Sequence, residues 1–260
     1  MTETLSHAGA LTRFVDDVVL TLALTAGPDA RDPLSFTSAG IGDGERWDRL
    51  RGGRLEVGLM SAPFGIRPEP AVEPVIAAAL AKITAAVPAR YSDAAIDAPL
   101  PRDVFEALWV TARGLGYEKL FARHAAIMDP GLVRLGPLAQ AYSLSRFFEA
   151  IGNRRSFVSA AFKLFDTVDL LLMPTMPIGA FDAAAEVPAG GDAEAPLSWI
   201  TWTPYTYPFN LRPTGDLAAM RTCARRHAGC RADRRATCWL SPAQSRPRSL
   251  SVSVIRCAFL

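Results

Sequence analysis

Four cysteines and one histidine lie within the last 38 residues, and both residue types can bind zinc or, for cysteine, form disulfides. They are Cys223, Cys230, Cys238 and Cys257, with His227 among them. Structural zinc sites usually contain closely spaced Cys-x2-Cys or His-x3–5-His pairs, and neither pair occurs here. The N-terminus lacks a basic start followed by an apolar stretch, so we expect no secretory signal and no disulfide framework. The sequence therefore predicts no metal ion and no cofactor.

Charge is divided unevenly along the chain. Residues 212–260 carry ten arginines and two aspartates, a net charge of +8. Residues 1–211 carry 18 basic and 24 acidic side chains, a net charge of −6, so the whole chain has +2. Basic segments bind nucleic acid through its phosphates. This one has few aromatic residues and no regular amphipathic pattern, so we expect no nucleic-acid partner.

Composition excludes two further classes of protein. Half of the residues are hydrophobic, which argues against disorder throughout. No apolar run reaches about 18 residues, the length that a membrane-spanning helix needs. We therefore expect no membrane partner and a cytoplasmic location.

Strands and helices alternate along the first 210 residues, which predicts an α/β domain. The first expected helix ends at Gly27-Pro28, and the second runs from Pro74 to Pro88. The third begins at an Asp103-x-x-Glu106 capping box, and the fourth runs from Ser143 to Phe165. The expected strands are 55–60, 91–96 and the buried 168–173, and residues 179–198 are expected to form a surface loop. On the last helix, Phe147, Phe148 and Phe157 are predicted in the core and Arg154-Arg155 on a solvated face.

Three stretches together resemble the amidase signature hydrolases. Residues 4–13 (TLSHAGALTR) and 26–33 (AGPDARDP) flank the first helix as the family's D-H-x-G-P-M-T-R and A-G-x-D-x-R-D-P segments do. Residues 169–177 (DLLLMPTMP) resemble D-x-L-L-x-P-T-x-P, and residues 203–210 (TPYTYPFN) resemble T-P-F-T-Y-P-F-N. The resemblance implies a mixed sheet covered by helices, incomplete here, with residues 1–210 forming the C-terminal portion of the domain.

The resemblance also implies a reaction. In this family a serine attacks the amide carbonyl, and a lysine acts as base through a bridging serine. The 260 residues contain no Gly-Gly-Ser-Ser run, and the three lysines, Lys82, Lys119 and Lys163, lie in expected helices that do not match the catalytic lysine. We therefore assign no catalytic residue in this chain and expect it to be inactive alone.

Thr175, Met176 and Trp202 are the predicted substrate-binding residues. Thr175 and Met176 follow a buried strand, at the edge where α/β proteins bind ligands. By resemblance this loop borders the pocket for the acyl group of a small amide substrate. Trp202 can line that pocket or pack in the core. The resemblance also implies that intact members form homodimers.

Residues 211–260 depart from the family pattern, and we interpret them as an aberrant, disordered tail. When the codons are read in a frame shifted by one base, residues 212–216 can encode G-Q-P-A-I, which the family has after its P-F-N segment. Residues 227–235 can likewise encode M-P-V-A-V-Q-I-V-G, close to a later family segment. The hypothesis is a frameshift near Leu211.

The sequence thus predicts a truncated, inactive amidase-family hydrolase. One alternative is a fragment that has no catalytic role and binds a partner. Another is the remnant of a glutamyl-tRNA amidotransferase-type A subunit, which shares the motifs.

Overall fold

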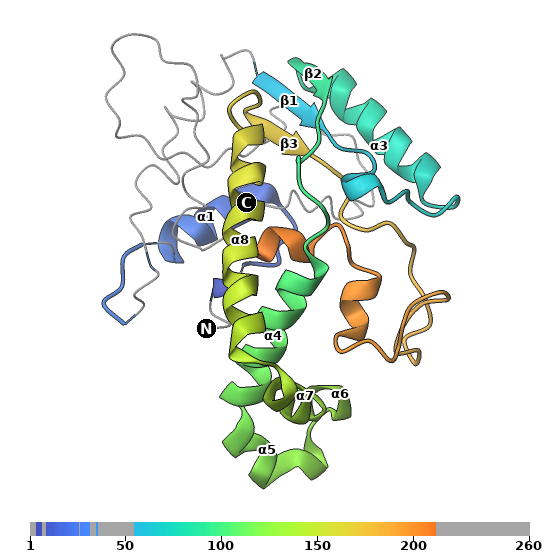
Figure 1. The fold of residues 1–260 in the computed structure, drawn as a ribbon. Coiled ribbons are helices and arrows are strands. Elements are labelled where there is room, and N and C mark those ends of the chain that lie inside the picture. Colours follow the sequence, from blue (N-terminus) through green and yellow to red (C-terminus); the bar gives the residue numbers. More distant parts are fainter. Residues whose placement is uncertain (1–3, 7–8, 26, 32–34, 36–54, 212–260) are drawn as a thin grey trace.

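A small sheet lies at one end of the molecule, and a layer of helices extends away from it (Figure 1). The computed structural model describes residues 4–6, 9–25, 27–31, 35 and 55–211. The predicted tail, residues 211–260, therefore lies outside the described residues, apart from Leu211, which is fully buried. His7 also lies outside the described residues, and of the turn at 26–33 only residues 27–31 are described.

Three parallel strands form the sheet in the order β2-β1-β3. They are β1 (Leu55–Leu59), β2 (Ala89–Asp93) and β3 (Leu170–Leu172). The central strand aligns Val57 with Tyr91 on one side and with Leu170 on the other. The predicted α/β class is confirmed, and every pairing between the described strands is parallel. The second strand begins and ends earlier than the predicted 91–96 range.

Helix α3 (Glu73–Ala86) connects β1 to β2 and lies beside the sheet (Figure 1). Pro74 stands in its first turn, where a missing N–H costs no helical hydrogen bond. Leu80 and Ile83 pack on a small cluster formed by the buried strand residues, which are Leu55, Val57 and Leu172. The sheet therefore has a hydrophobic core of its own, but a small one.

The main core lies between the long helices. Helix α4 (Arg102–Gly116) packs on α7 (Leu135–Ala141) and on α8 (Leu144–Leu164), while α5 (Glu118–His124), η3 (Ala125–Ile127) and α6 (Pro130–Val133) extend the end away from the sheet. Phe105 and Val110 of α4 are fully buried. The aromatic segment near residue 210 contributes Tyr207 to the same core through the short helix η5 (Tyr207–Leu211). This core fixes the position of the segment that contains Trp202.

Helix ends follow the sequence in one case and depart from it in another. Helix α8 begins at the predicted place, because the Ser143 hydroxyl accepts a hydrogen bond from the Arg146 backbone N–H at 3.1 Å. The predicted capping box at α4 is wrong. Pro101 precedes this helix, no side chain caps it, and the Glu106 carboxylate instead accepts hydrogen bonds from Tyr142 and Arg146. Glu106 therefore does not cap the start of α4. Its carboxylate instead binds Arg146 of α8.

The N-terminal helix α1 (Val15–Thr25) contributes no buried residue to either core. In Figure 1 it overlaps α8 in the view drawn. Within the described ranges, no helix combines the length and the apolar character needed to cross a membrane.

Candidate functional site

The predicted site residues Thr175 and Met176 lie just beyond the carboxyl end of β3. Because β3 and β1 are parallel, their carboxyl ends lie at the same edge of the sheet. The backbone N–H of Met60, which follows β1, donates to the Leu172 carbonyl oxygen at 3.0 Å and keeps the two ends together. Ligands of parallel α/β sheets bind outside this edge, so the loop lies where a binding site is expected.

Glu69 holds the loop after β3 against the segment that follows β1. Its backbone N–H donates to the Pro177 carbonyl oxygen at 2.8 Å, and its carboxylate accepts from the Gly179 N–H at 3.4 Å. The loop is therefore attached at two points within three residues, which limits the positions open to Met176.

The segment after β1 is itself fixed by aromatic packing. Phe64, in the short helix η2 (Pro63–Gly65), has a φ of +57°, a conformation that non-glycine residues rarely adopt. Its ring packs against Phe157 and Phe209, with ring centroids 6.1 and 6.3 Å away. Two residues later, the Ile66 carbonyl oxygen accepts a hydrogen bond from the Tyr205 hydroxyl. Side-chain contacts of this kind offset the strain at Phe64.

Trp202 lies at the end of the short helix η4 (Ser198–Thr201). The Thr203 hydroxyl donates to the Trp199 carbonyl oxygen at 2.9 Å, which closes the turn around it. The Trp202 ring meets Phe181 edge-to-face, with centroids 5.1 Å apart and planes at 80°. This contact joins the predicted surface loop 179–198 to the aromatic segment.

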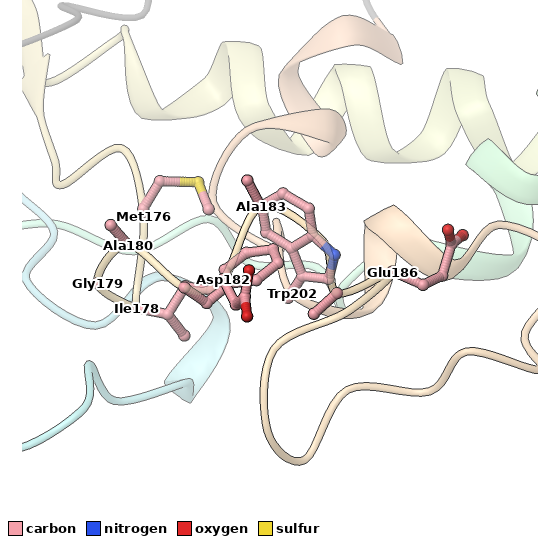
Figure 2. Close-up of a pocket in the computed structure, with 10 residues that line it drawn as sticks. Met176, Ile178, Gly179, Ala180, Asp182, Ala183, Glu186 and Trp202 are labelled. Atoms are coloured by element: carbon pink, nitrogen blue, oxygen red, sulfur yellow. The ribbon is translucent and has the colours of Figure 1, made fainter.

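Met176 and Trp202 line one open pocket of about 560 Å³, shown in Figure 2. The other lining residues come from the loop between them: Ile178, Gly179, Ala180, Phe181, Asp182, Ala183, Ala185 and Glu186. Thr175 is half-buried and does not line the pocket. The structure therefore brings together two of the three predicted site residues.

The loop 179–198 contributes more than the sequence indicated. Its first half is mostly exposed, as predicted, but Phe181 and Glu186 form part of the pocket wall. Its second half turns inward, where Ala195, Leu197 and Ser198 are buried. Phe181 was the one residue in the sequence that could have indicated this contact, since a single aromatic residue in an Ala- and Gly-rich segment needs a packing partner.

The lining residues of the pocket contain no serine, lysine or histidine. The Asp182 carboxylate accepts the Ala184 N–H at 2.9 Å, and the Glu186 carboxylate accepts the Ser198 hydroxyl at 2.7 Å. All three lysines of the chain are exposed on α3, α5 and α8. In the described part of the chain, no cluster of three His, Cys, Asp or Glu side chains could hold a metal ion.

Burial changes the properties of the aromatic groups near the pocket. The Trp202 indole Nε1 is buried and has no hydrogen-bond partner among the described residues. Burial raises the pKa of the Tyr205 hydroxyl to about 12, and it also raises the pKa of Tyr207. Both hydroxyls therefore hold their protons more strongly than a solvated tyrosine does.

Comparison with known protein families shows which family this chain matches. The family model described as Amidase matches residues 1–223, most of the chain. The chain belongs to the amidase family. The resemblance inferred from the three stretches is thereby confirmed.

Individual relatives of this amidase-family chain are distant. An amidase of Pseudomonas putida is 24% identical over 211 residues, which cover 78% of this chain and 43% of the relative. The crystal structure of a bacterial aryl acylamidase of the amidase signature family matches with a TM-score of 0.59 at 21% identity, covering 78% of this chain and 44% of that one. A second amidase structure matches with a TM-score of 0.51 at 18% identity, over 62% and 37% of the two chains.

These matches show a shared fold and define its extent. The chain spans less than half the length of the relatives it matches. The family match also extends past Leu211 by twelve residues, into the segment that we interpreted from the sequence as an aberrant tail.

Proposed function

We propose that this chain forms the substrate-pocket portion of an enzyme that hydrolyses carboxylic amides to an acid and an amine or ammonia. The observation that supports it is the pocket beside β3. Met176, from a family-like strand and loop, and Trp202, next to the family-like aromatic segment, line the same cavity in a chain of the amidase family. Met176 lies within one of the stretches that the sequence identified independently, and Trp202 directly precedes another.

The pocket walls favour an uncharged apolar group as the bound part of the substrate. Met176, Ile178 and Trp202 offer apolar surface, and Phe181 fixes the tryptophan ring. The indole Nε1–H is the polar group without a partner, so it is available to an acceptor such as an amide oxygen if the ring shifts slightly.

The bond-making groups must lie outside the 260 residues. By family resemblance, a serine oxygen attacks the amide carbonyl, the amine leaves with a proton, and water then releases the acid from the acyl-serine. The chain contains no Gly-Gly-Ser-Ser run, and its three lysines are exposed and do not line the pocket. We therefore propose that this chain binds amides and does not turn them over by itself.

Binding and turnover are tested with a simple aryl amide and a simple aliphatic amide. We expect no amine release from the purified chain, and a change in tryptophan fluorescence on amide binding that is lost in Trp202→Phe. Met176→Ala should weaken binding several-fold, whereas Met128→Ala should not, because Met128 is equally half-buried but lies after η3. Equal binding by both methionine variants would contradict the pocket assignment, and amide turnover by the chain alone would contradict the assignment of catalysis to another segment.

We also propose that residues 211–260 arise from a frameshift and add nothing to this function. The support is that residues 212–216 and 227–235 can each be written with codons that encode a family-like segment when they are read one base out of frame.

A further inference from the structure

Glu69 stands between two prolines in the segment that connects β1 to α3. Proline has a fixed φ and no backbone N–H, and a residue that precedes a proline is restricted to extended conformations. Pro68 and Pro70 therefore make residues 68–70 stiff before any contact with the rest of the chain forms. The only backbone N–H that these three residues can donate is that of Glu69.

The backbone of Glu69 connects the start of α3 to the loop that follows β3. Its N–H donates to the Pro177 carbonyl oxygen at 2.8 Å, so the single N–H of the stiff segment is used on this loop. Its carbonyl oxygen accepts from the N–H groups of Val72 and Glu73 at 2.8 and 3.0 Å, where α3 begins. Because α3 packs on the strand cluster, the loop is attached through Glu69 to an element that is itself fixed.

The Glu69 side chain makes a second attachment to the same loop. Its carboxylate accepts a hydrogen bond from the Gly179 N–H at 3.4 Å. The Pro177 carbonyl and the Gly179 N–H belong to the two peptide groups that flank Ile178. Holding both peptide groups restricts the two soft backbone dihedrals of Ile178. The side chain of Ile178 lines the pocket with Trp202 (Figure 2), so the position of this part of the wall depends on Glu69.

The Glu69 carboxylate forms no ion pair with any residue that the structure describes, although a comparable carboxylate nearby does. Glu73, in the first turn of α3, pairs with Arg67 at 3.1 Å. Both glutamates are exposed. The hydrogen bond from Gly179 is therefore the interaction that distinguishes Glu69 from Glu73, and Glu73 provides a matched control.

We propose that Glu69 is a positioning residue, which sets the place of Ile178 in the pocket wall and thereby the size of the substrate group that the pocket accepts. This inference rests on the proposed function for the nature of that group, the apolar part of an amide. Glu69 does not line the pocket, so it acts through Ile178. Without the carboxylate, the loop keeps its bond at Pro177 but loses the one at Gly179, and Ile178 can then turn away from the pocket. A wall residue that can turn away accepts groups of different size more equally.

The test uses the full 260-residue chain and two measurements on Glu69→Ala. Hydrogen exchange of the Gly179 amide, followed by nuclear magnetic resonance, should become several-fold faster because its acceptor is removed. Tryptophan fluorescence titrations give the Kd for a bulky aryl amide and for a small aliphatic amide, and the ratio of these values should move several-fold toward one. Glu69→Gln should keep both results near those of the parent chain, because the glutamine side-chain oxygen also accepts an N–H.

Two further variants separate positioning from a general loss of stability. Glu73→Ala removes the exposed carboxylate that pairs with Arg67, and we expect it to change neither measurement. Ile178→Ala removes the side chain through which Glu69 is proposed to act, so adding Glu69→Ala to it should alter the Kd ratio little further. Such non-additivity is expected of two residues that act together.

Unchanged exchange of the Gly179 amide in Glu69→Ala would overturn the proposal, because the carboxylate then does not hold the loop. A Kd ratio of one in the parent chain would also overturn it, as would a ratio that Glu69→Ala leaves unchanged or changes equally with and without Ile178→Ala. Equal effects of Glu69→Gln and Glu69→Ala would exclude the hydrogen bond as the cause. A parent chain that binds neither amide contradicts the proposed function, whereas faster Gly179 exchange in Glu69→Ala then still supports the positioning of Ile178.

Discussion

The guanidinium of Arg154, in the middle of α8, donates to both oxygens of Thr4, which is 150 residues away in sequence. Nη1 donates to the Thr4 hydroxyl at 3.0 Å and Nη2 donates to its carbonyl oxygen at 2.8 Å. Nε of the same side chain donates to the carbonyl oxygen of the buried Leu211. One arginine therefore joins the two ends of the described domain, where the family-like segments begin and end.

Replacing Arg154 by methionine should lower the free energy of unfolding by about 2 kcal/mol, because two backbone carbonyl oxygens lose a charged donor. Burial already lowers the pKa of this guanidinium, so it is not a freely solvated charge. The neighbouring Arg155 is exposed, and Arg155→Met should change stability by less than about 0.5 kcal/mol. Chemical denaturation followed by circular dichroism measures both variants. Equal effects would show that the contacts to Thr4 and Leu211 do not stabilise the domain.

Gly114 permits the close approach of α4 and α7. A Cβ at this position would overlap the Leu135 carbonyl oxygen and the Ala139 side chain. Gly114→Ala should therefore force the helices apart and destabilise the protein by roughly 1–3 kcal/mol. Gly152 lies on the exposed side of α8 with nothing near its missing Cβ, so Gly152→Ala should stabilise by about 0.5–1 kcal/mol. Thermal unfolding of the pair should show shifts of opposite sign, and shifts of the same sign would contradict the packing argument.

Alkaline pH should destabilise the protein through its buried tyrosines. Burial, followed by the hydrogen bond to Glu106, raises the pKa of Tyr142 to about 12, and burial raises that of Tyr205 to about 12. The unfolded chain loses these protons near pH 10, while the folded protein keeps them. The stabilisation is therefore complete below about pH 10 and is lost as the pH rises toward 12.

Tyr142→Phe should reduce that alkaline loss, because the ring remains and the titrating hydroxyl is removed. At neutral pH it should cost about 1 kcal/mol, since Glu106 then keeps only its ion pair with Arg146, at 3.0 Å. Denaturation curves at pH 8, 10 and 11 on the variant and the parent chain measure both effects. An unchanged pH dependence in Tyr142→Phe would show that this hydroxyl does not couple to folding.

The proposed frameshift makes two predictions about residues 211–260. Resequencing the gene across the codon for Leu211 should reveal a base insertion or deletion relative to an amidase-family reading frame, and an intact family frame there would contradict the proposal. A chain shortened to residues 1–211 should keep the unfolding midpoint and amide binding of the full chain. A large loss of stability on shortening would show that the tail contributes to folding.

Local sequence was sufficient for most of the secondary structure. Proline positions, the serine cap and the apolar periods predicted α1, α3, α8 and all three strands to within a few residues. The reason is that each signal acts within one element: Pro74 suits the first turn of α3, and Ser143 accepts the Arg146 N–H from its own helix. The three family-like stretches likewise were sufficient to identify the amidase family.

Contacts between distant elements could not be predicted in this way. Arg154 and Arg155 are adjacent arginines, and both were predicted to face solvent, but only Arg154 meets residues 4 and 211. Phe148 was predicted in the core together with Phe157, yet it is 61% exposed while Phe157 is buried.

The site shows the same division. The sequence alone determined that Met176 and Trp202 were candidates, because each lies in or beside a family-like motif. Only the tertiary structure decided that they line one pocket, that Phe181 and Glu186 complete its wall, and that Thr175 stays outside it. The physical reason is that a pocket forms where segments distant in sequence pack together. Periodicity and local spacing describe one segment at a time, so they could not show that the segments containing residues 176 and 202 lie side by side.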